Sequence, residues 1–390
     1  MTRRIAAITT SRADYGHLYW PLKELQAHPD IELELIVIGA HLSPEFGLTV
    51  DEVERDGFKV DARVECLMSS DTDVGMAKTI GVATISLADV LDRMRPDILL
   101  LIADRYELLA PAATALALRL PIAHIEGGEV SEGAIDDAVR NALTKMSHIH
   151  FTPTEQARLR VLAMGEEPWR VHRTGAPSLD HLRRRPLISQ NDLERDLDLD
   201  LNKPSVMVAY HPVTLDQNTT QEGDEVFAAL AELEQQIIFC FPNADAGSRG
   251  LIQRAEAFCE SHASARLFVN LGHIKYWSLL NCVDLLYGNS SSGIMETASL
   301  KLPTVNIGRR QQGRERARNV IDTPAQKQYI LDAVEKALSS EFRQSLEGMS
   351  NPYGDGFAAE RMAEVLAKAP LGEQLLLKKA MPLDIASEPG

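Results

Sequence analysis

Short apolar runs alternate along the chain with longer segments in which apolar residues recur at helical spacing. The short runs predict buried strands, and the longer amphipathic segments predict helices. In the first half, strands are predicted at 5–9, 33–38, 59–64, 98–102, 122–125 and 148–151, with helices between them, such as 84–94 and 108–119. Strands that alternate with helices are typical of βαβ units, so a parallel sheet is expected.

A charged, proline-containing stretch from 182 to 204 interrupts this rhythm, which restarts with strands predicted at 206–210, 237–241, 267–269, 283–287 and 304–307. A chain of 390 residues is also too long for one core of ordinary size. The sequence therefore predicts an α/β protein with two Rossmann-like, doubly wound domains, at residues 1–180 and 181–355, and a ligand cleft between them. A helix at 356–370 is expected to pack back across the domains, and residues 371–390 are expected to be weakly ordered.

The charge of the chain narrows the kinds of partner it can have. The formal net charge is −16, which argues against non-specific binding to nucleic acid or to an anionic membrane, since both need a basic face. No apolar stretch approaches the roughly 20 residues of a membrane span, and the N-terminus lacks the long apolar run of a signal peptide. The four cysteines are widely spaced and show no metal-ligand pattern. We therefore expect a cytoplasmic protein without a metal site.

The motif SRADYG follows the first predicted strand and places Arg12 and Gly16 at the start of a helix. An arginine beside the free N–H groups of a helix N-terminus can hold an anion. A capping turn with a surface arginine is the alternative interpretation. The motif is not the GxGxxG fingerprint of dinucleotide binding, which argues against NAD or FAD as a cofactor.

Three acidic residues follow consecutive predicted elements of the first half, namely Asp104 in ADRYE, Glu126 in HIEGGE and Asp136 in IDDAVR. Asp104 could instead cap a helix, and Asp136 could form a surface ion pair with Arg140 one helical turn later. Glu126 precedes two glycines and has no obvious structural duty. Closely placed carboxyl groups raise one another's pKa, so one can donate a proton while another accepts it. Together, the three acids predict a site of proton transfer.

Two strand ends in the second half carry further polar residues. His211 follows the strand at 206–210 in the motif HPVT, where it could contact phosphate or transfer protons near neutral pH. A structural histidine is the alternative. Asn243 lies in FPNADAG, where a second strand opens into polar residues and glycine.

The segment YGNSSSGIMETA has the clearest phosphate-binding pattern in the chain. A strand, a turn containing Ser290 and Ser291, and a helix would aim N–H and hydroxyl groups at an anion. Glu296 in that helix suits ribose hydroxyls, and Arg310 belongs to a basic loop, GRRQQGRE, that suits a diphosphate. A solvated run of charges is the alternative for this loop.

These eight motifs, in this order, resemble those of the hydrolysing UDP-N-acetylglucosamine 2-epimerases, from about residue 4 to about residue 368. The family includes bacterial enzymes of sialic and legionaminic acid synthesis and the epimerase half of the bifunctional animal epimerase/kinase. The resemblance implies a GT-B-like pair of Rossmann domains, a UDP-sugar as small-molecule partner, no cofactor, and a homodimer or homotetramer. It implies conversion of UDP-N-acetylglucosamine and water to UDP and N-acetylmannosamine.

The resemblance also assigns residues. Asp104, Glu126, Asp136 and His211 match positions implicated in catalysis. Arg12, Arg105, Ser291, Glu296 and Arg310 match positions that contact UDP, and the predicted substrate site also includes Gly16, Arg140, Asn243 and Ser290. Two departures from the family's pattern occur. Ala103 stands where relatives usually have glycine, and Glu132 is an apparent insertion that leaves both Asp136 and Asp137 as matches for one family position.

The expected reaction is an elimination, because loss of UDP from C1 acidifies the C2 proton and gives a 2-acetamidoglucal. One carboxylate, by preference Asp104, would take that proton, and water would then add at C1 while a proton returns to the opposite face of C2. The same chemistry on a 2,4-diacetamido-2,4,6-trideoxy-UDP-glucose of a legionaminic acid pathway is the nearest alternative. A non-hydrolysing epimerase, a GT-B glycosyltransferase and a non-catalytic UDP-sugar-binding regulator are the further alternatives.

Overall fold

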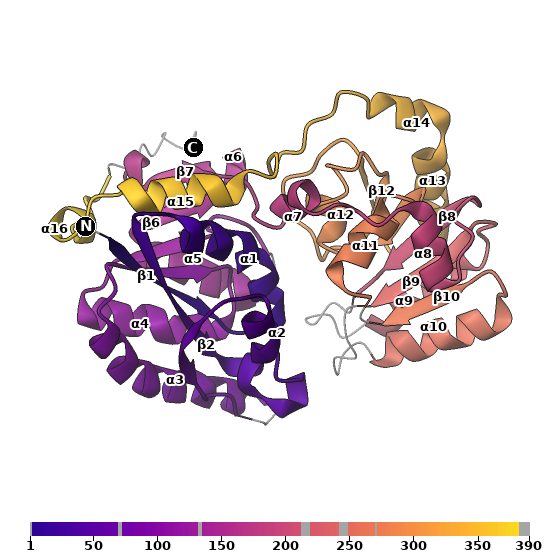
Figure 1. Cartoon of the computed structure of the whole chain (residues 1–390). Helices are drawn as coiled ribbons and strands as arrows, with labels where there is room; N and C mark the ends of the chain where they lie inside the picture. Colours follow the sequence, from indigo (N-terminus) through magenta and orange to yellow (C-terminus); the bar gives the residue numbers. More distant parts are fainter. Residues whose placement is uncertain are drawn as a thin grey trace, which may run out of the picture. The chain divides into compact units, whose positions relative to one another are not determined.

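The chain folds into two compact units, each built around its own parallel sheet (Figure 1). The computed structural model describes residues 2–68, 72–131, 135–211, 219–241, 249–269 and 271–381. The first unit comprises Met1–Glu129, Ile135–His181 and Tyr353–Gly390, and the second comprises Val130–Ala134 and Leu182–Pro352. The last segment of the chain therefore belongs to the first unit.

Seven parallel strands form the sheet of the first unit, in the order β3-β2-β1-β4-β5-β6-β7. They are β1 (Arg3–Thr9), β2 (Ile31–Ile38), β3 (Val60–Val64), β4 (Ile98–Ile102), β5 (Ile122–Ile125), β6 (Ile149–Thr152) and β7 (Val171–Arg173). The strand order reverses between β1 and β4, and doubly wound sheets bind ligands beyond the strand ends at such a point. The six strands predicted for this half all form, whereas β7 was not predicted.

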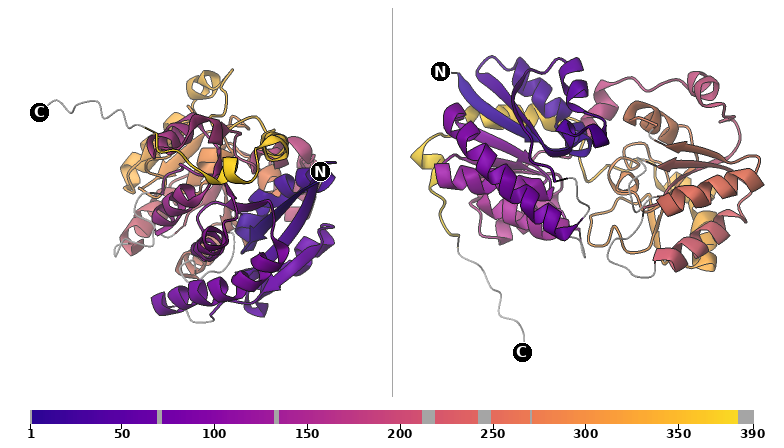
Figure 2. Two further views of the ribbon diagram at one scale, coloured as in Figure 1. Left: turned by 90° about the vertical axis from the view of Figure 1, so that its left-hand side faces the viewer. Right: turned by 90° about the horizontal axis from the view of Figure 1, so that it is seen from below.

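Helices cover both faces of this sheet, as the two views in Figure 2 show. One face packs against α1 (Arg12–Ala27), α2 (Val50–Arg55) and α15 (Ala358–Lys368), and the other against α3 (Asp73–Met94), α4 (Leu109–Leu118) and α5 (Ile135–Met146). The unit also contains α6 (Glu155–Ala163), and α7 (Leu179–Arg184) begins at its boundary. Short 3-10 helices occur at Gly39–Leu42, Pro44–Phe46, Tyr106–Leu108 and Pro168–Arg170.

Helix α3 is long and apolar enough to cross a membrane, judged by its length and composition alone. Its inward residues Ala83, Leu87 and Leu91 are fully buried against the sheet. Packing against the sheet explains the apolar character of this row, whereas Val74 and Ile85 of the same helix are exposed.

The sheet of the second unit has six parallel strands in the order β10-β9-β8-β11-β12-β13, with the reversal between β8 and β11. The strands are β8 (Ser205–Ala209), β9 (Gln236–Phe241), β10 (Arg266–Val269), β11 (Leu285–Gly288), β12 (Thr304–Ile307) and β13 (Val320–Thr323). The helices are α8 (Gln190–Leu197), α9 (Thr219–Leu230), α10 (Arg249–Ser261), α11 (His273–Leu280), α12 (Ser292–Met295), α13 (Lys327–Leu338) and α14 (Ser340–Ser345). The predicted α/β class with two doubly wound sheets is confirmed.

The C-terminal segment returns to the first unit, where α15 packs beside α1. The buried carboxylate of Asp180 accepts the N–H groups of Ala358 and Ala359, at 3.0 and 2.9 Å, and so caps the N-terminus of α15. A further short helix, α16 (Glu373–Leu376), follows, and its Leu375 is fully buried. The weak order predicted from residue 371 onward is therefore not found up to residue 381, because this part of the tail joins the core of the first unit.

Candidate active site

Helix α1 starts directly after β1 because Asp14 caps its first turn. The Asp14 carboxylate accepts the N–H groups of Thr10 and Ser11, both at 2.7 Å. Arg12 thus lies in the first turn, with its Nε 3.7 Å from Oε2 of Glu52. Its side chain is 39% exposed, so its guanidinium is accessible to a ligand.

Gly16 lies one turn further along α1, where a Cβ would meet no atom within 4 Å. Its carbonyl accepts the Nε2 hydrogen of His181 at 2.8 Å. Packing within the described residues therefore does not require glycine at this position.

Asp104 follows β4 and forms an ion pair with Arg140 of α5. The Arg140 side chain is only 4% exposed, so its surroundings hold it in place. Arg140 of α5 thereby fixes the Asp104 carboxylate at the end of β4. Arg140 also lies 4.0 Å from Asp137, which accepts a hydrogen bond from Asn141 at 3.0 Å. Asp136 is exposed at the start of α5.

Glu126 follows the neighbouring strand, β5, and adopts a left-handed backbone with φ of 65°. The residue is 8% exposed, and its Oε1 lies 2.8 Å from Nδ1 of His17 on α1. His17 was not among the residues predicted from the sequence, although it directly follows SRADYG. Arg12, Asp104 and Glu126 therefore follow the ends of strands β1, β4 and β5 of one parallel sheet, whereas Asp136 is exposed on α5.

Gly128 of HIEGGE has a positive φ of 79°, and a Cβ there would lie 2.2 Å from the carbonyl oxygen of Ala157 in α6. A glycine after a strand can let the backbone approach a ligand. In the structure, its close neighbour is the protein's own helix.

Arg105 donates to Glu107 at 2.7 Å, and the Glu107 side chain is fully buried. The Arg105 side chain itself is 40% exposed. Glu107 therefore orients a guanidinium that solvent and ligands can reach.

Asn289 joins three strand ends of the second unit. Its side-chain oxygen accepts the N–H of His211 at 2.7 Å, and its amide nitrogen donates to the His211 carbonyl at 2.9 Å. Its own carbonyl accepts from Arg310 and Gln311, both at 2.9 Å. Asn289 is fully buried, so it fixes the ends of β8, β11 and β12 at one edge of the sheet.

The residue before Asn289 must be glycine. Gly288 has a φ of 140°, and a Cβ would lie 2.2 Å from the Ala209 carbonyl oxygen at the end of β8. This close approach places the Asn289 side chain against the His211 backbone. Asn289 was not selected from the sequence, although it stands in the quoted NSSSG motif, because its partner is 78 residues away.

Burial and the nearby Arg310 lower the pKa of His211 to about 4, so the ring is neutral at pH 7. Ser290 and Ser291 are partly exposed just before α12, and Glu296 at its end is 7% exposed. His211, Ser290, Ser291 and Arg310 therefore lie around the Asn289 junction. Asn243, like residues 212–218, lies outside the described residues.

Among the described residues, no group of three or more histidine, cysteine, aspartate or glutamate side chains is arranged to hold a metal ion. The polar side chains near the strand ends of the two units are arginines, acids, histidines, amides and hydroxyls. Such groups suit an anionic, hydroxyl-rich ligand and proton transfer to or from it.

Two Rossmann-like units with polar clusters at their strand ends define a GT-B-like protein. The sequence profile of the UDP-N-acetylglucosamine 2-epimerase family matches residues 23–367, and the chain belongs to this family. The family predicted from the order of the motifs is thereby confirmed.

Relatives that match almost the whole chain carry two kinds of substrate name. The chain is 36% identical over 348 residues to the GDP/UDP-N,N'-diacetylbacillosamine 2-epimerase (hydrolyzing) of Campylobacter jejuni, covering 88% of this chain and 89% of the relative. It is 36% identical over 380 residues to the UDP-N,N'-diacetylbacillosamine 2-epimerase (hydrolyzing) of Legionella pneumophila, covering 97% and 99%. It is 32% identical over 367 residues to a UDP-N-acetylglucosamine 2-epimerase of Neisseria meningitidis, covering 93% and 95%.

A solved structure shares the fold. The crystal structure of UDP-GlcNAc 2-epimerase from Neisseria meningitidis bound to UDP-GlcNAc superposes with a TM-score of 0.81, covering 94% of this chain and 100% of that one. The sequence identity is 19%, so this likeness establishes the architecture alone.

Proposed function

We propose that this protein is a hydrolysing 2-epimerase that converts UDP-N-acetylglucosamine and water to UDP and N-acetylmannosamine. One observation carries the proposal. This member of the family holds Asp104 and Glu126 at the ends of the neighbouring strands β4 and β5. Asp104 is paired with Arg140, and Glu126 with His17. Paired carboxyl groups in fixed positions can abstract a proton and return one.

In the proposed reaction the C1–O bond breaks and its electron pair leaves with UDP, while Asp104 takes the C2 proton. The product of this step is a 2-acetamidoglucal. Glu126 and Asp136, or Asp137 in its place, serve the return of a proton to the other face of C2 and the activation of the water that adds at C1. Net consumption of one water gives the free sugar and UDP.

The second unit is proposed to bind the UDP moiety. Arg310 is anchored through Asn289, and Ser290 and Ser291 offer hydroxyl and N–H groups beside it. A guanidinium and hydrogen-bond donors that are already oriented stabilise the charge that develops on a departing diphosphate. Arg12 and Arg105 are proposed as further contacts of the first unit.

The neutral state of His211 predicts that UDP binding takes up a proton. A bound diphosphate favours the imidazolium, so it raises the pKa of His211 above its value of about 4 in the free protein. UDP affinity should therefore gain a contribution from His211 as the pH falls through the window between these two pKa values. Calorimetric titrations at about pH 5.5, in two buffers of different ionisation enthalpy, measure the uptake.

His211→Gln is the matched variant for this titration, because UDP itself changes protonation in the same range. The variant should take up fewer protons than the natural protein. Equal uptake by both would show that His211 does not sense the diphosphate.

The 2,4-diacetamido-2,4,6-trideoxy-UDP-glucose is the alternative substrate for the same chemistry. The two relatives at 36% identity are named for UDP-N,N'-diacetylbacillosamine, whereas the family profile and the relative at 32% are named for UDP-N-acetylglucosamine. The two sugars differ at C4 and C6, so the chemistry at C1 and C2 is common to both. A cytoplasmic location and a homo-oligomeric state remain predictions.

Incubation of the purified protein with each UDP-sugar separately, in D₂O and followed by NMR, tests the proposal. We expect UDP and a free manno-configured sugar that carries deuterium at C2. The sugar with the higher kcat/KM is the substrate. A manno-configured sugar still attached to UDP would indicate a non-hydrolysing epimerase, and binding without turnover of either sugar would indicate a regulator.

A further inference from the structure

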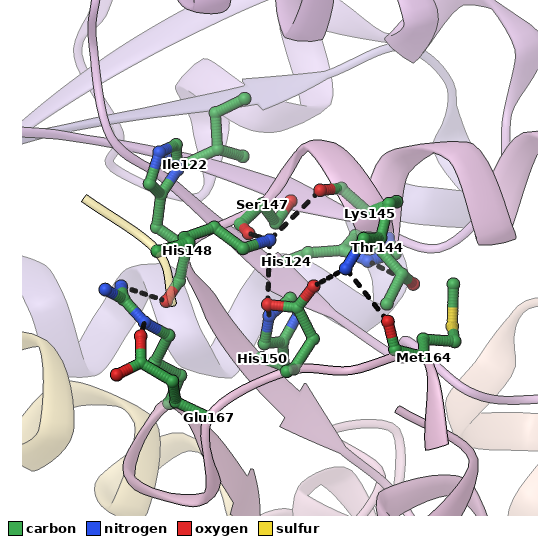
Figure 3. Close-up of polar contacts among 12 residues, drawn as sticks. Ile122, His124, Thr144, Lys145, Ser147, His148, His150, Met164 and Glu167 are labelled. Carbon is green, nitrogen blue, oxygen red and sulfur yellow. Dashed lines mark hydrogen bonds and ion pairs between the residues drawn. The ribbon is translucent and has the colours of Figure 1, made fainter. Parts of the chain in front are cut away.

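Two buried side chains of the first unit, His124 of β5 and Thr144 of α5 (Figure 3), form a hydrogen-bonded pair. Both residues are fully buried. Nε2 of His124 lies 2.8 Å from the carbonyl oxygen of Ala103, the residue before Asp104. The hydroxyl of Thr144 lies 3.3 Å from Nδ1 of His124.

The partners of His124 define its tautomer. A carbonyl oxygen can only accept, so Nε2 carries the hydrogen and donates it to Ala103. Nδ1 is then the acceptor for the Thr144 hydroxyl. Burial lowers the pKa of His124 to about 4, so the ring stays neutral at pH 7 and does not need to change charge in this role.

Ala103 has a backbone conformation that alanine rarely adopts. Its φ is 58°, in the left-handed region that glycine enters freely and alanine only at a cost. Its N–H donates to the Ile125 carbonyl at 2.9 Å, and its carbonyl accepts from His124. Strand β5 thus holds the peptide groups on both sides of this residue.

The same helix holds Asp104 in two ways. Arg140 pairs with the Asp104 carboxylate, and Thr144, one turn later on α5, supports His124. The pair also leaves little room for a side chain in the loop after Glu126, because a Cβ on Gly127 would lie 3.0 Å from the Thr144 hydroxyl and 3.2 Å from His124 Nδ1.

We propose that His124, oriented by Thr144, is a positioning residue that holds Ala103 in its left-handed conformation and so places the carboxylate of Asp104. The consequence for turnover rests on the proposed function. The geometric claim does not, because it concerns the tautomer of His124 and the backbone of Ala103 in the free protein.

Substitutions of His124 separate positioning from proton transfer. His124→Leu should lower kcat about 10²-fold with a change in KM of less than about threefold, because a displaced catalytic group costs rate rather than binding. His124→Gln places an amide N–H donor near the position of Nε2 and should recover kcat to within about tenfold of the natural protein. Equal losses for leucine and glutamine would overturn the proposal, since glutamine cannot transfer a proton but can hold a carbonyl.

Ala103→Gly tests whether His124 acts by holding the left-handed backbone of Ala103, because a gain in kcat is expected. Glycine enters the left-handed region without the cost that alanine bears, so the loop should depend less on His124. Ala103→Gly in the His124→Leu background should therefore raise kcat by about 3–10-fold, while in the natural background it changes kcat by less than about twofold. No gain in the double variant would mean that His124 does not act through Ala103.

His148→Leu is the matched control. His148 is 5% exposed, and its Nδ1 accepts the N–H of Ile122 at 3.1 Å at the opposite end of the same strand (Figure 3). Like His124→Leu, the His148→Leu substitution removes a buried histidine that contacts the first unit's sheet. His148, however, does not contact the residue before Asp104. We expect lower thermal stability with kcat per folded molecule within about twofold. A loss of kcat as large as that of His124→Leu would reduce the role of His124 to general support of the strand.

The tautomer is measured without turnover. Long-range ¹H–¹⁵N correlation of the ring nitrogens in protein labelled at histidine should show His124 protonated at Nε2 and neutral down to about pH 5. The His124→Gln spectrum assigns the signals. A hydrogen on Nδ1, or titration near pH 6.5, would overturn the geometric claim. If neither sugar is turned over, the proposed function fails while this measurement still decides the geometry.

Discussion

Asp104→Asn is expected to lower kcat by about 10²–10⁴-fold while UDP binds with little loss of affinity. Asparagine has nearly the same shape and can still accept a hydrogen bond from Arg140, which forms an ion pair with Asp104. It cannot accept the C2 proton, so the elimination step loses its base. Initial rates and calorimetric titration with UDP measure the two quantities on the same preparations.

Asp97→Asn is the matched control for this substitution. Asp97 immediately precedes β4, and its carboxylate accepts the N–H of Arg4 at 2.9 Å, whereas Asp104 lies beyond the other end of the same strand. The control should change stability slightly and leave kcat unchanged. If Asp104→Asn kept full turnover, Asp104 would not be the base, and Glu126→Gln would be the next variant to measure.

The strands that the sequence predicts best are those with uninterrupted apolar runs. The bounds of β4, β5 and β12 agree with the prediction to the residue, because these central strands are buried on both faces. The two strands that were missed, β7 and β13, are edge strands with partly exposed residues. A short edge strand needs no continuous apolar run, so its sequence resembles a loop.

The sequence motifs gave the candidate site residues. The partners of these residues, which the motifs did not give, follow from the fold. His17 and Glu126 are 109 residues apart, and Asn289 and His211 are 78 apart. Each pair exists because parallel strands end at one edge of a sheet, which local periodicity does not encode. The register between neighbouring strands, and with it the contact of His124 with Ala103, likewise follows only from the assembled sheet.

The tail was predicted poorly for the same reason. Residues 373–379 read EQLLLKK, an apolar run too short to predict where it packs. In the structure Arg170, which is fully buried, bonds to the carbonyls of Leu375 and Leu377, both at 2.8 Å. Lys378 pairs with Glu166 at 2.7 Å. Burial alone would raise the pKa of Glu166, but hydrogen bonds from His150, Lys145 and Lys378 lower it to about 2.

Arg170→Met is expected to destabilise the first unit by about 3–5 kcal/mol, because removing one partner from a buried charged network leaves the other groups unpaired. Arg170 pairs with Glu167 at 2.7 Å and bonds to the His148 carbonyl at 3.1 Å as well as to the tail. Methionine is close in size to the aliphatic part of arginine, so the loss reports on the polar contacts rather than on a cavity. Urea unfolding, followed by near-ultraviolet absorption, measures the change in the free energy of unfolding. Hydrogen exchange measures it independently.

Arg158→Met is the control, because Arg158 also pairs with a glutamate three residues away, Glu155, but is 30% exposed. Exposed pairs contribute roughly 0–1 kcal/mol, so this variant should unfold almost as the natural protein does. Hydrogen exchange adds a local test, since the Lys379 N–H, 3.2 Å from Glu167, should be protected in the natural protein and exchange rapidly in Arg170→Met. Rapid exchange of this segment in both proteins would show that Arg170 does not anchor the tail in solution.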